Sequence, residues 1–75
     1  MEVIAHGDAK VVGKAVGQID LPTGITIGAI VRADTVLIAH DDVVVAPDDH
    51  VILFIVDKSR IRAVEKLFQV GLGFF

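Results

Sequence analysis

The sequence contains no cysteine, no tyrosine and no tryptophan, and each absence removes a class of protein. Without cysteine there is no disulfide framework, no thiolate metal site and no thiol nucleophile, so packing alone must stabilise the fold. Without tyrosine and tryptophan the chain lacks the side chains on which single-stranded nucleic acids usually stack. A formal net charge of −3 also argues against a nucleic-acid partner, because neutralising phosphates requires a basic surface.

Long hydrophobic runs are missing as well. The longest stretch without a charged residue is 21–31, which contains Pro22 and Gly24. A membrane-spanning helix needs about 18 consecutive apolar residues, which this stretch does not supply. Residues 1–10 contain acids and a histidine where a signal peptide has a basic and then an apolar segment. We therefore expect no secretion, no direct membrane insertion and a cytoplasmic location.

What the chain does contain is apolar surface. Its 75 residues are 53% hydrophobic, with a mean hydropathy of +0.69. A domain of this size hides only about 60% of the surface that its unfolded chain exposes. The length allows one small domain, residues 1–75, and the surplus of apolar side chains predicts that part of its surface is buried against a partner.

Alternating apolar residues and turn residues predict the strands. Residues 25–32 place Ile25, Ile27, Ala29 and Val31 on one face of a strand, and the pair Ala33-Asp34 turns a tight hairpin into the next strand. The unbroken apolar run 51–56 predicts a central strand that is covered on both faces. Before it, 46–49 favours a type I turn with Pro47 at its second position. The predicted extended segments are 2–6, 25–32, 35–38, 43–45 and 51–56.

Two segments have helical spacing. Residues 11–19 carry apolar side chains three and four apart, which predicts a short amphipathic helix that Gly13 and Gly17 weaken. A longer helix begins at a cap formed by Asp57 or Ser59 and ends at a glycine, 71 or 73. Its apolar stripe is Ile61, Val64, Leu67 and Phe68. The sequence therefore predicts an α+β domain: a small mixed or antiparallel sheet of four to five strands, with a short helix after the first strand and a longer C-terminal helix.

An acidic region flanked by histidines is the first candidate for binding chemistry. Two aspartate pairs, 41–42 and 48–49, lie between His40 and His50. Carboxylates that converge would suit a hard cation such as Ca²⁺. Aspartate pairs also end strands and keep turns soluble, which is the commoner role. Zinc is less favoured, because there is no cysteine and no pair of histidines four residues apart.

A catalytic site is not apparent. Ser59 is the only serine, and no Gly-x-Ser-x-Gly motif surrounds it. The three histidines, His6, His40 and His50, show no spacing that combines a base, an orienting acid and an oxyanion donor. We predict no catalytic residues and no enzyme activity.

The end of the sequence is apolar. Exposed adjacent phenylalanines are unfavourable in water, although chain ends are commonly frayed. We predict a docking or dimer contact there, with the candidate interface residues Phe68, Leu72, Phe74 and Phe75.

Short motifs in a fixed order run through most of the chain. They are VVGK at 11–14, Leu21-Pro22 followed by Gly24, AIVR at 29–32, DHVIL at 49–53 and VEKLF at 64–68. In this order they resemble the C-terminal regulatory domain of the TrkA family, also called the C-lobe of RCK (regulator of potassium conductance) domains. The chain departs from the family pattern at Asp48, where a glycine usually precedes the turn aspartate.

The resemblance implies a cytosolic subunit, peripheral to the inner face of the cell membrane, that gates a potassium-uptake protein. In that family a Rossmann-type domain binds dinucleotide or ATP, and the C-terminal domain dimerises and can sense a second ligand. No G-x-G-x-x-G motif follows a strand here. We therefore expect no cofactor in this domain, which would be a fragment or a stand-alone lobe. The implied partners are a second copy of the chain and, through the full-length protein, the membrane subunit of the transporter.

The leading hypothesis is a non-catalytic regulatory, ligand-sensing and dimerisation domain of a Trk-type potassium uptake system. The alternative is a small-ligand or divalent-cation sensor domain of another transporter or antiporter. Some members of the resembled family bind a cyclic dinucleotide or a divalent cation at this lobe, but no residue set here carries either ligand over. The candidate ligand-binding residues are Arg32, His40, Asp41, Asp42, Asp49 and His50, and no metal ligand is assigned.

Overall fold

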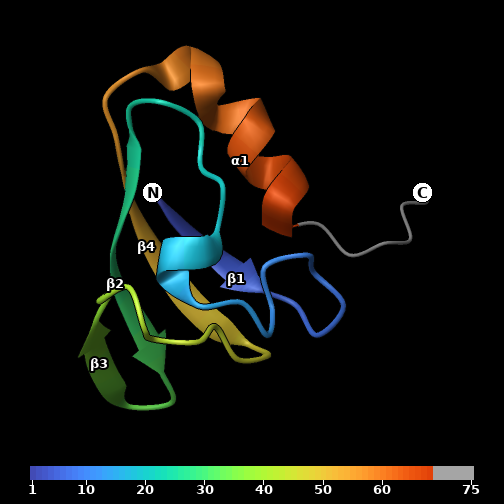
Figure 1. Ribbon diagram of the computed structural model, residues 1–75, viewed down its shortest axis with the longest axis vertical. Coiled ribbons are helices and arrows are strands. Elements are labelled where there is room, and N and C mark those ends of the chain that lie inside the picture. Colours follow the sequence, from blue (N-terminus) through green and yellow to red (C-terminus); the bar gives the residue numbers. More distant parts are fainter. Residues whose placement is uncertain (69–75) are drawn as a thin grey trace.

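The structure, a computed structural model, describes residues 1–68 (Figure 1). Its strands are β1 (Glu2–Ala5), β2 (Ile25–Arg32), β3 (Thr35–Ile38) and β4 (Asp49–Ile55). Its helical segments are the short 3-10 turns η1 (Val16–Gln18) and η2 (Lys58–Arg60) and the helix α1 (Ile61–Phe68). Neighbouring strands are antiparallel, in the order β1-β4-β2-β3. The predicted α+β domain, with a four-stranded antiparallel sheet and a C-terminal helix, is confirmed.

The short helix predicted at residues 11–19 is wrong except for the single turn η1. Gly13 has a φ of +88°, which a right-handed helix excludes. Backbone amides that a helix would use internally instead bond to the segment 41–45: Gly13 donates to the Val45 carbonyl at 2.8 Å, and Val16 donates to the Val43 carbonyl at 2.8 Å. The two segments form a narrow ribbon with a bridge between Ala15 and Val44. The predicted extended segment 43–45 is therefore paired outside the main sheet.

The hairpin between β2 and β3 turns at Ala33 and Asp34, as predicted, with Arg32 paired to Thr35. The predicted alternation of β2 holds only to Ile27, because a β-bulge separates Ile27 from Ala29 in the pairing with β4. One extra residue moves every later side chain to the opposite face. Ile30 is consequently buried, and Ala29 and Val31 lie on the other side of the sheet from Ile25 and Ile27.

One face of the sheet carries the core. α1 packs against β1 on this side, and η1 lies over the same side in Figure 1. We call this the inner face and the opposite side the outer face. The buried apolar residues are Ala5, Ala9, Val11, Ile19, Ile25, Ile27, Ile30, Val45, Val51, Leu53, Val64 and Phe68.

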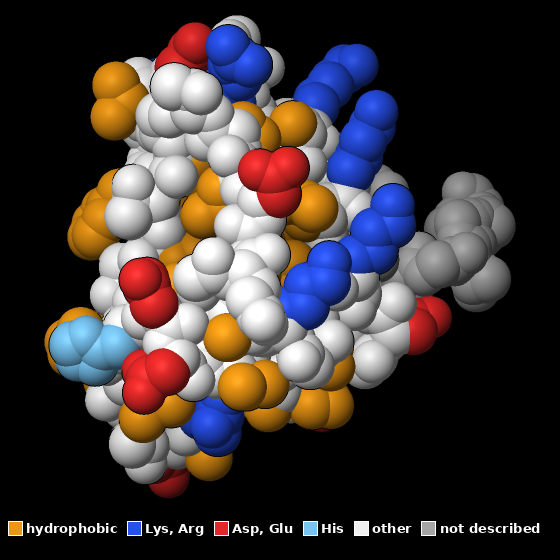
Figure 2. All heavy atoms as spheres, viewed as in Figure 1, with side chains coloured by type: hydrophobic (Ala, Val, Ile, Leu, Met, Phe, Trp, Pro, Cys, Tyr) orange, Lys and Arg blue, Asp and Glu red, His pale blue; other side chains and the backbone are white. Residues whose placement is uncertain are grey.

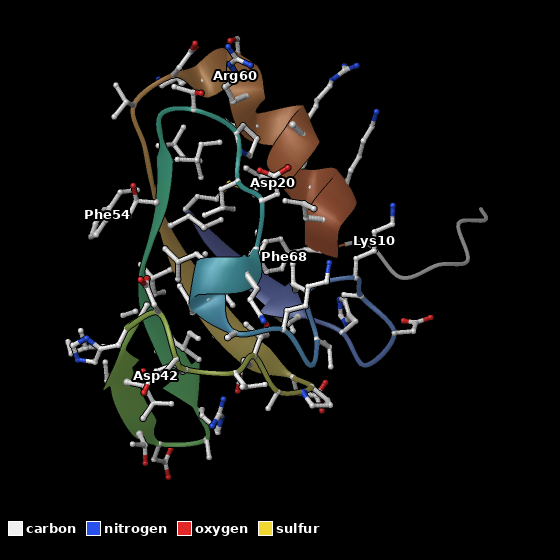
Figure 3. The ribbon with its side chains drawn as sticks, viewed as in Figure 1. Lys10, Asp20, Asp42, Phe54, Arg60 and Phe68 are labelled. Atoms are coloured by element: carbon white, nitrogen blue, oxygen red, sulfur yellow. The ribbon has the colours of Figure 1, made fainter. Side chains whose placement is uncertain are left out.

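β4 is a central strand, as its apolar run predicts, but within residues 1–68 it is covered on only one face. Val51 and Leu53 point inward and are buried, whereas Phe54 points outward and is 63% exposed. Figure 3 shows Phe54 directed away from η1 and α1. The predicted cover on both faces is therefore wrong for the part of the chain that the structure describes.

The C-terminal helical region begins with the predicted Asp57 cap, which precedes the 3-10 turn η2, and α1 itself begins at Ile61. The Asp57 carboxylate accepts hydrogen bonds from the Ser59 amide at 3.0 Å and from the Ser59 hydroxyl at 2.7 Å. These bonds hold the pKa of Asp57 below its ordinary value. Val64 and Phe68 are buried, and the cations of the helix point outward, where Lys and Arg side chains gather over α1 (Figure 2). The predicted end of the helix at a glycine lies outside the described residues.

No helix within residues 1–68 has the length and apolar character needed to cross a bilayer.

Candidate functional site

Arg32 and Asp49 form a bidentate ion pair at one end of the sheet. β2 and β4 run side by side there, because Val31 pairs with His50. The Arg32 Nε donates to Asp49 Oδ1 at 2.9 Å, and its Nη2 donates to Asp49 Oδ2 at 2.8 Å. The Asp49 side chain is 1% exposed, and that of Arg32 is 42% exposed. Paired hydrogen bonds of this kind are among the stronger polar contacts in proteins.

The ion pair also anchors the loop before β4. Arg32 Nη2 donates to the Val44 carbonyl at 2.8 Å, and the Ala46 amide donates to Asp49 Oδ2 at 2.8 Å. Hydrogen bonding to Arg32 holds the pKa of Asp49 below its ordinary value, and the same contact raises the pKa of Arg32. Two predicted ligand residues are thus bonded to each other and to the backbone, and these bonds hold the loop before β4 in place.

The turn that leads into Asp49 differs from the predicted type I turn. The Asp49 amide donates to the Ala46 carbonyl at 3.2 Å, so the turn spans the predicted residues. Its third residue, Asp48, has a φ of +69°. A positive φ after Pro47 is the geometry of a type II turn, which favours glycine at this position. Glycine adopts this left-handed conformation without the strain that an aspartate has there.

His40, Asp41 and Asp42 are exposed in the loop after β3. The loop is tied to η1 through its backbone, since the Gly17 amide donates to the Asp41 carbonyl at 2.9 Å. The contact is close: a Cβ at residue 17 would lie 2.9 Å from the Asp41 Cβ. Asp42 lies beside β3 at the opposite end of the molecule from Arg60 (Figure 3).

His50 lies on the outer face, away from the other candidates. Its Nδ1 is 2.8 Å from Glu2 Oε2 on β1. The six predicted ligand residues therefore occupy three separate places: the Arg32–Asp49 pair, the loop 40–42 and the outer face. Within residues 1–68 no three His, Asp or Glu side chains are grouped closely enough to hold a metal ion. The predicted convergence of the two aspartate pairs with both histidines does not occur.

The Ser59 hydroxyl donates a hydrogen bond to the Asp57 carboxylate, which is the N-cap of η2. Among the hydrogen bonds of the described residues, none joins Ser59 to His6, His40 or His50. The geometry therefore offers no activated serine nucleophile in this part of the chain.

The predicted interface residues have different surroundings. Phe68 is 4% exposed and packs in the domain's own core, so its side chain has little surface to offer a partner. Figure 3 shows it pointing inward from the end of α1. Leu72, Phe74 and Phe75 lie outside the described residues. A contact made by these residues stays a prediction.

Sequence reasoning missed the main exposed apolar surface, which is the outer face of the sheet. Strand pairing places three rows of side chains on it. Among them Ile4, Val36, Ile38 and Phe54 are exposed, with Val36 at 65% and Ile38 at 63%. The apolar strand 35–38 indicates an exposed apolar surface. The continuous apolar run of β4, however, does not show which of its side chains point outward. The rows are Ile4–His50–Val31–Val36, Glu2–Ile52–Ala29–Ile38, and Phe54 beside Thr26.

Comparison with known proteins finds the same kind of domain. The family model described as the TrkA-C domain matches residues 1–69. The chain is 69% identical over 78 residues to the Trk system potassium uptake protein TrkA of Halomonas elongata, and 57% identical over 72 residues to that of Vibrio alginolyticus. The alignments cover 100% and 92% of this chain but only 17% and 16% of those proteins.

A solved structure has a similar fold. It is the RCK_C domain dimer of S. agalactiae BusR in complex with c-di-AMP, 25% identical, with a TM-score of 0.77. The match covers 99% of this chain and 94% of that one. The chain is thus similar to a nearly complete RCK_C domain and to a small part of the TrkA proteins.

Proposed function

Because the chain belongs to the TrkA-C domain family, we propose that it is a dimerising regulatory domain that gates the membrane transporter of a Trk potassium uptake system. The family and the TrkA relatives support a regulatory domain of such a system. The chain spans only 17% of the Halomonas protein. Gating and contact with the transporter are therefore proposed for this chain as part of a longer protein. The domain is non-catalytic and acts at the cytoplasmic face of the membrane, and nucleotide binding resides in another part of the full-length protein.

The observation that carries the proposal is the outer face. A monomer rarely leaves a contiguous apolar surface of this kind in water unless it binds a partner. Ile4, Val36, Ile38 and Phe54 are exposed on strands that also supply the core on their other side.

The proposed occupant of the outer face is a second copy of the chain. The similar BusR structure is described as a dimer, and this chain matches 94% of that single-domain chain. Two copies related by a two-fold axis would present the same apolar rows to each other, which is the commonest arrangement in homodimers. The transporter is then regulated through the geometry of the dimer. A ligand or a neighbouring domain that binds one geometry more tightly shifts its population, and this shift is passed to the membrane subunit.

Sedimentation equilibrium of the 75-residue chain tests the dimer. We expect a dimer at tens of micromolar, and a shift towards monomer in Val36→Ser/Ile38→Ser. Val44→Ser is the matched control, because Val44 is exposed on the ribbon outside the main sheet and its loss leaves the outer face intact. A monomeric wild-type chain, or equal weakening by the control, would contradict the proposal.

Gating is tested separately in the full-length protein. The Val36→Ser/Ile38→Ser change should alter potassium uptake by a strain that depends on the Trk system, whereas Val44→Ser should not. The sensor alternative is addressed by calorimetric titration of the chain with Mg²⁺, Ca²⁺ and a cyclic dinucleotide. If one of these ligands releases heat on binding and the chain stays monomeric, the ligand-sensor alternative is favoured over the dimerising regulatory domain.

A further inference from the structure

The outer face is apolar except for one pair of titratable side chains. Along its three rows the residues are aliphatic, aromatic, threonine or alanine, apart from Glu2 on β1 and His50 on β4. His50 Nδ1 and Glu2 Oε2 are 2.8 Å apart, and the two side chains are 46% and 54% exposed. The pair therefore lies on the surface that we propose a second copy covers.

Within the three rows of the outer face, the charged side chain beside His50 is Glu2. His50 is flanked within its row by Ile4 on β1 and Val31 on β2. From β1 the charged group that faces it is Glu2, and β3 (Thr35–Ile38) contains no charged residue. From β2, Arg32 is turned to the inner face, where it is bonded to Asp49, the residue next to His50. Within the three rows the charge thus depends on the protonation of these two groups. The other charged or titratable groups beside the rows are Asp48 and Asp49 before His50, His6 after β1, and the Met1 amino group, which donates to the Leu53 carbonyl at 3.0 Å.

We propose that the His50–Glu2 pair makes self-association through the outer face depend on pH, with the dimer strengthened when His50 is protonated. This inference rests on the dimer of the proposed function. With a protonated imidazole the pair is an ion pair of zero net charge. With a neutral imidazole, Glu2 retains a negative charge that has only a neutral hydrogen-bond partner. Burying an unpaired carboxylate against apolar side chains is much less favourable than burying a paired one.

The direction of the effect follows from proton counting. An interface that favours the protonated pair over the deprotonated pair retains protons that the separate monomers release as the pH rises. Histidine is the side chain whose charge ordinarily changes between about pH 5 and 8. The dimer binds more protons than two monomers, so lowering the pH through this range shifts the equilibrium towards the dimer. Two protons can be linked to each association event. We expect the dissociation constant of the dimer to fall by about tenfold between pH 8 and pH 6. This change is much smaller than the largest change that the uptake of two protons per dimer allows.

Sedimentation equilibrium at pH 8, 7 and 6 and constant ionic strength tests the inference on the 75-residue chain. For the wild type the dissociation constant should fall about tenfold over this range. In His50→Gln it should stay constant within twofold. In Glu2→Gln the dependence should reverse, because the protonated imidazole is then the unpaired charge. His40→Gln is the matched control: it removes an exposed imidazole from the loop 40–42 and should keep the wild-type dependence.

The outcomes separate the two proposals. A dimer whose dissociation constant is the same at pH 6 and pH 8, or a His50→Gln variant that keeps the dependence, overturns the inference and leaves the dimer standing. A monomer at every pH overturns the dimer and the inference together. Circular dichroism of each variant at each pH confirms that all of them are folded in the comparison.

Discussion

The ring of Phe54 lies directly over Gly28 on the neighbouring strand. A Cβ at residue 28 would come within 2.3 Å of the Phe54 Cε2 atom. Gly28 sits at the β-bulge of β2, where the extra residue bends the strand. Glycine is needed here because it leaves room for the ring, and the aromatic side chain in turn covers backbone that glycine leaves bare.

Gly28→Ala should therefore displace the Phe54 ring. Since the ring is exposed and can rotate outward, we expect a modest loss of about 1 kcal/mol in the free energy of unfolding, measured by urea denaturation. In a Phe54→Ala background the same change should have little effect, because the group that it displaces is gone. Equal losses in the two backgrounds would show that the ring is not the reason for the glycine.

The Arg32–Asp49 pair predicts an asymmetry between two substitutions. Arg32→Met leaves a buried carboxylate with only the Ala46 amide as a partner, and should cost about 3–5 kcal/mol. Asp49→Asn leaves a guanidinium that is 42% exposed and keeps contact with water, so its cost should be smaller, about 1–3 kcal/mol. Urea denaturation measures both.

A double variant keeps this prediction testable if Arg32→Met fails to fold. Arg32→Met/Asp49→Leu has no buried charge and should be more stable than Arg32→Met alone. Equal free energies of unfolding for the single and the double variant would mean that the unpaired carboxylate is not what destabilises Arg32→Met.

The strands could be predicted from the sequence because their signals are local. β2 and β3 begin and end where alternation and the hairpin turn place them, and the Asp57 cap marks the start of the C-terminal helical region. The short helix failed for the opposite reason. Its spacing is helical, but residues 13–17 bond to 41–45, a segment far along the chain. A pairing between distant segments is not visible in the periodicity of either one.

The candidate site failed in a similar way. Arg32 and Asp49 are 17 residues apart and meet only because β2 and β4 adopt one register. His50 is adjacent to Asp49, yet strand alternation sends it to the opposite face. Closeness in sequence suggested a shared site, whereas the pleat of the strand separates these neighbours. The outer face was hidden because six consecutive apolar residues do not reveal which of them are covered.

The lowered pKa of Asp49 predicts how stability depends on pH. Its pKa in the folded chain lies below the ordinary 3.8 because Arg32 and the Ala46 amide bond to the carboxylate. The pair therefore contributes fully at pH values above 3.8, and its contribution is lost as the pH falls through the lower, folded value. The contribution of this carboxylate to the free energy of unfolding should stay constant between pH 7 and about pH 5 and decline below about pH 4. Asp49→Asn should flatten that decline, and Asp42→Asn, an exposed aspartate outside the pair, should leave it unchanged.

Asp48 occupies a left-handed backbone position, with a φ of +69°. An L-residue in this region is destabilised by about 1–2 kcal/mol, less for aspartate than for most residues. Glycine adopts the conformation without that strain but loses about 0.5–1 kcal/mol through the greater freedom of the unfolded chain. Asp48→Gly should therefore raise the free energy of unfolding slightly, by roughly 0.5 kcal/mol. Asp48→Ala removes the same charge and keeps the strained backbone, so it should be less stable than Asp48→Gly by about 1 kcal/mol. Thermal and urea denaturation of the three chains compare them directly. Equal stability of the glycine and alanine variants would mean that the turn relaxes to a negative φ and that glycine relieves no backbone strain at this position.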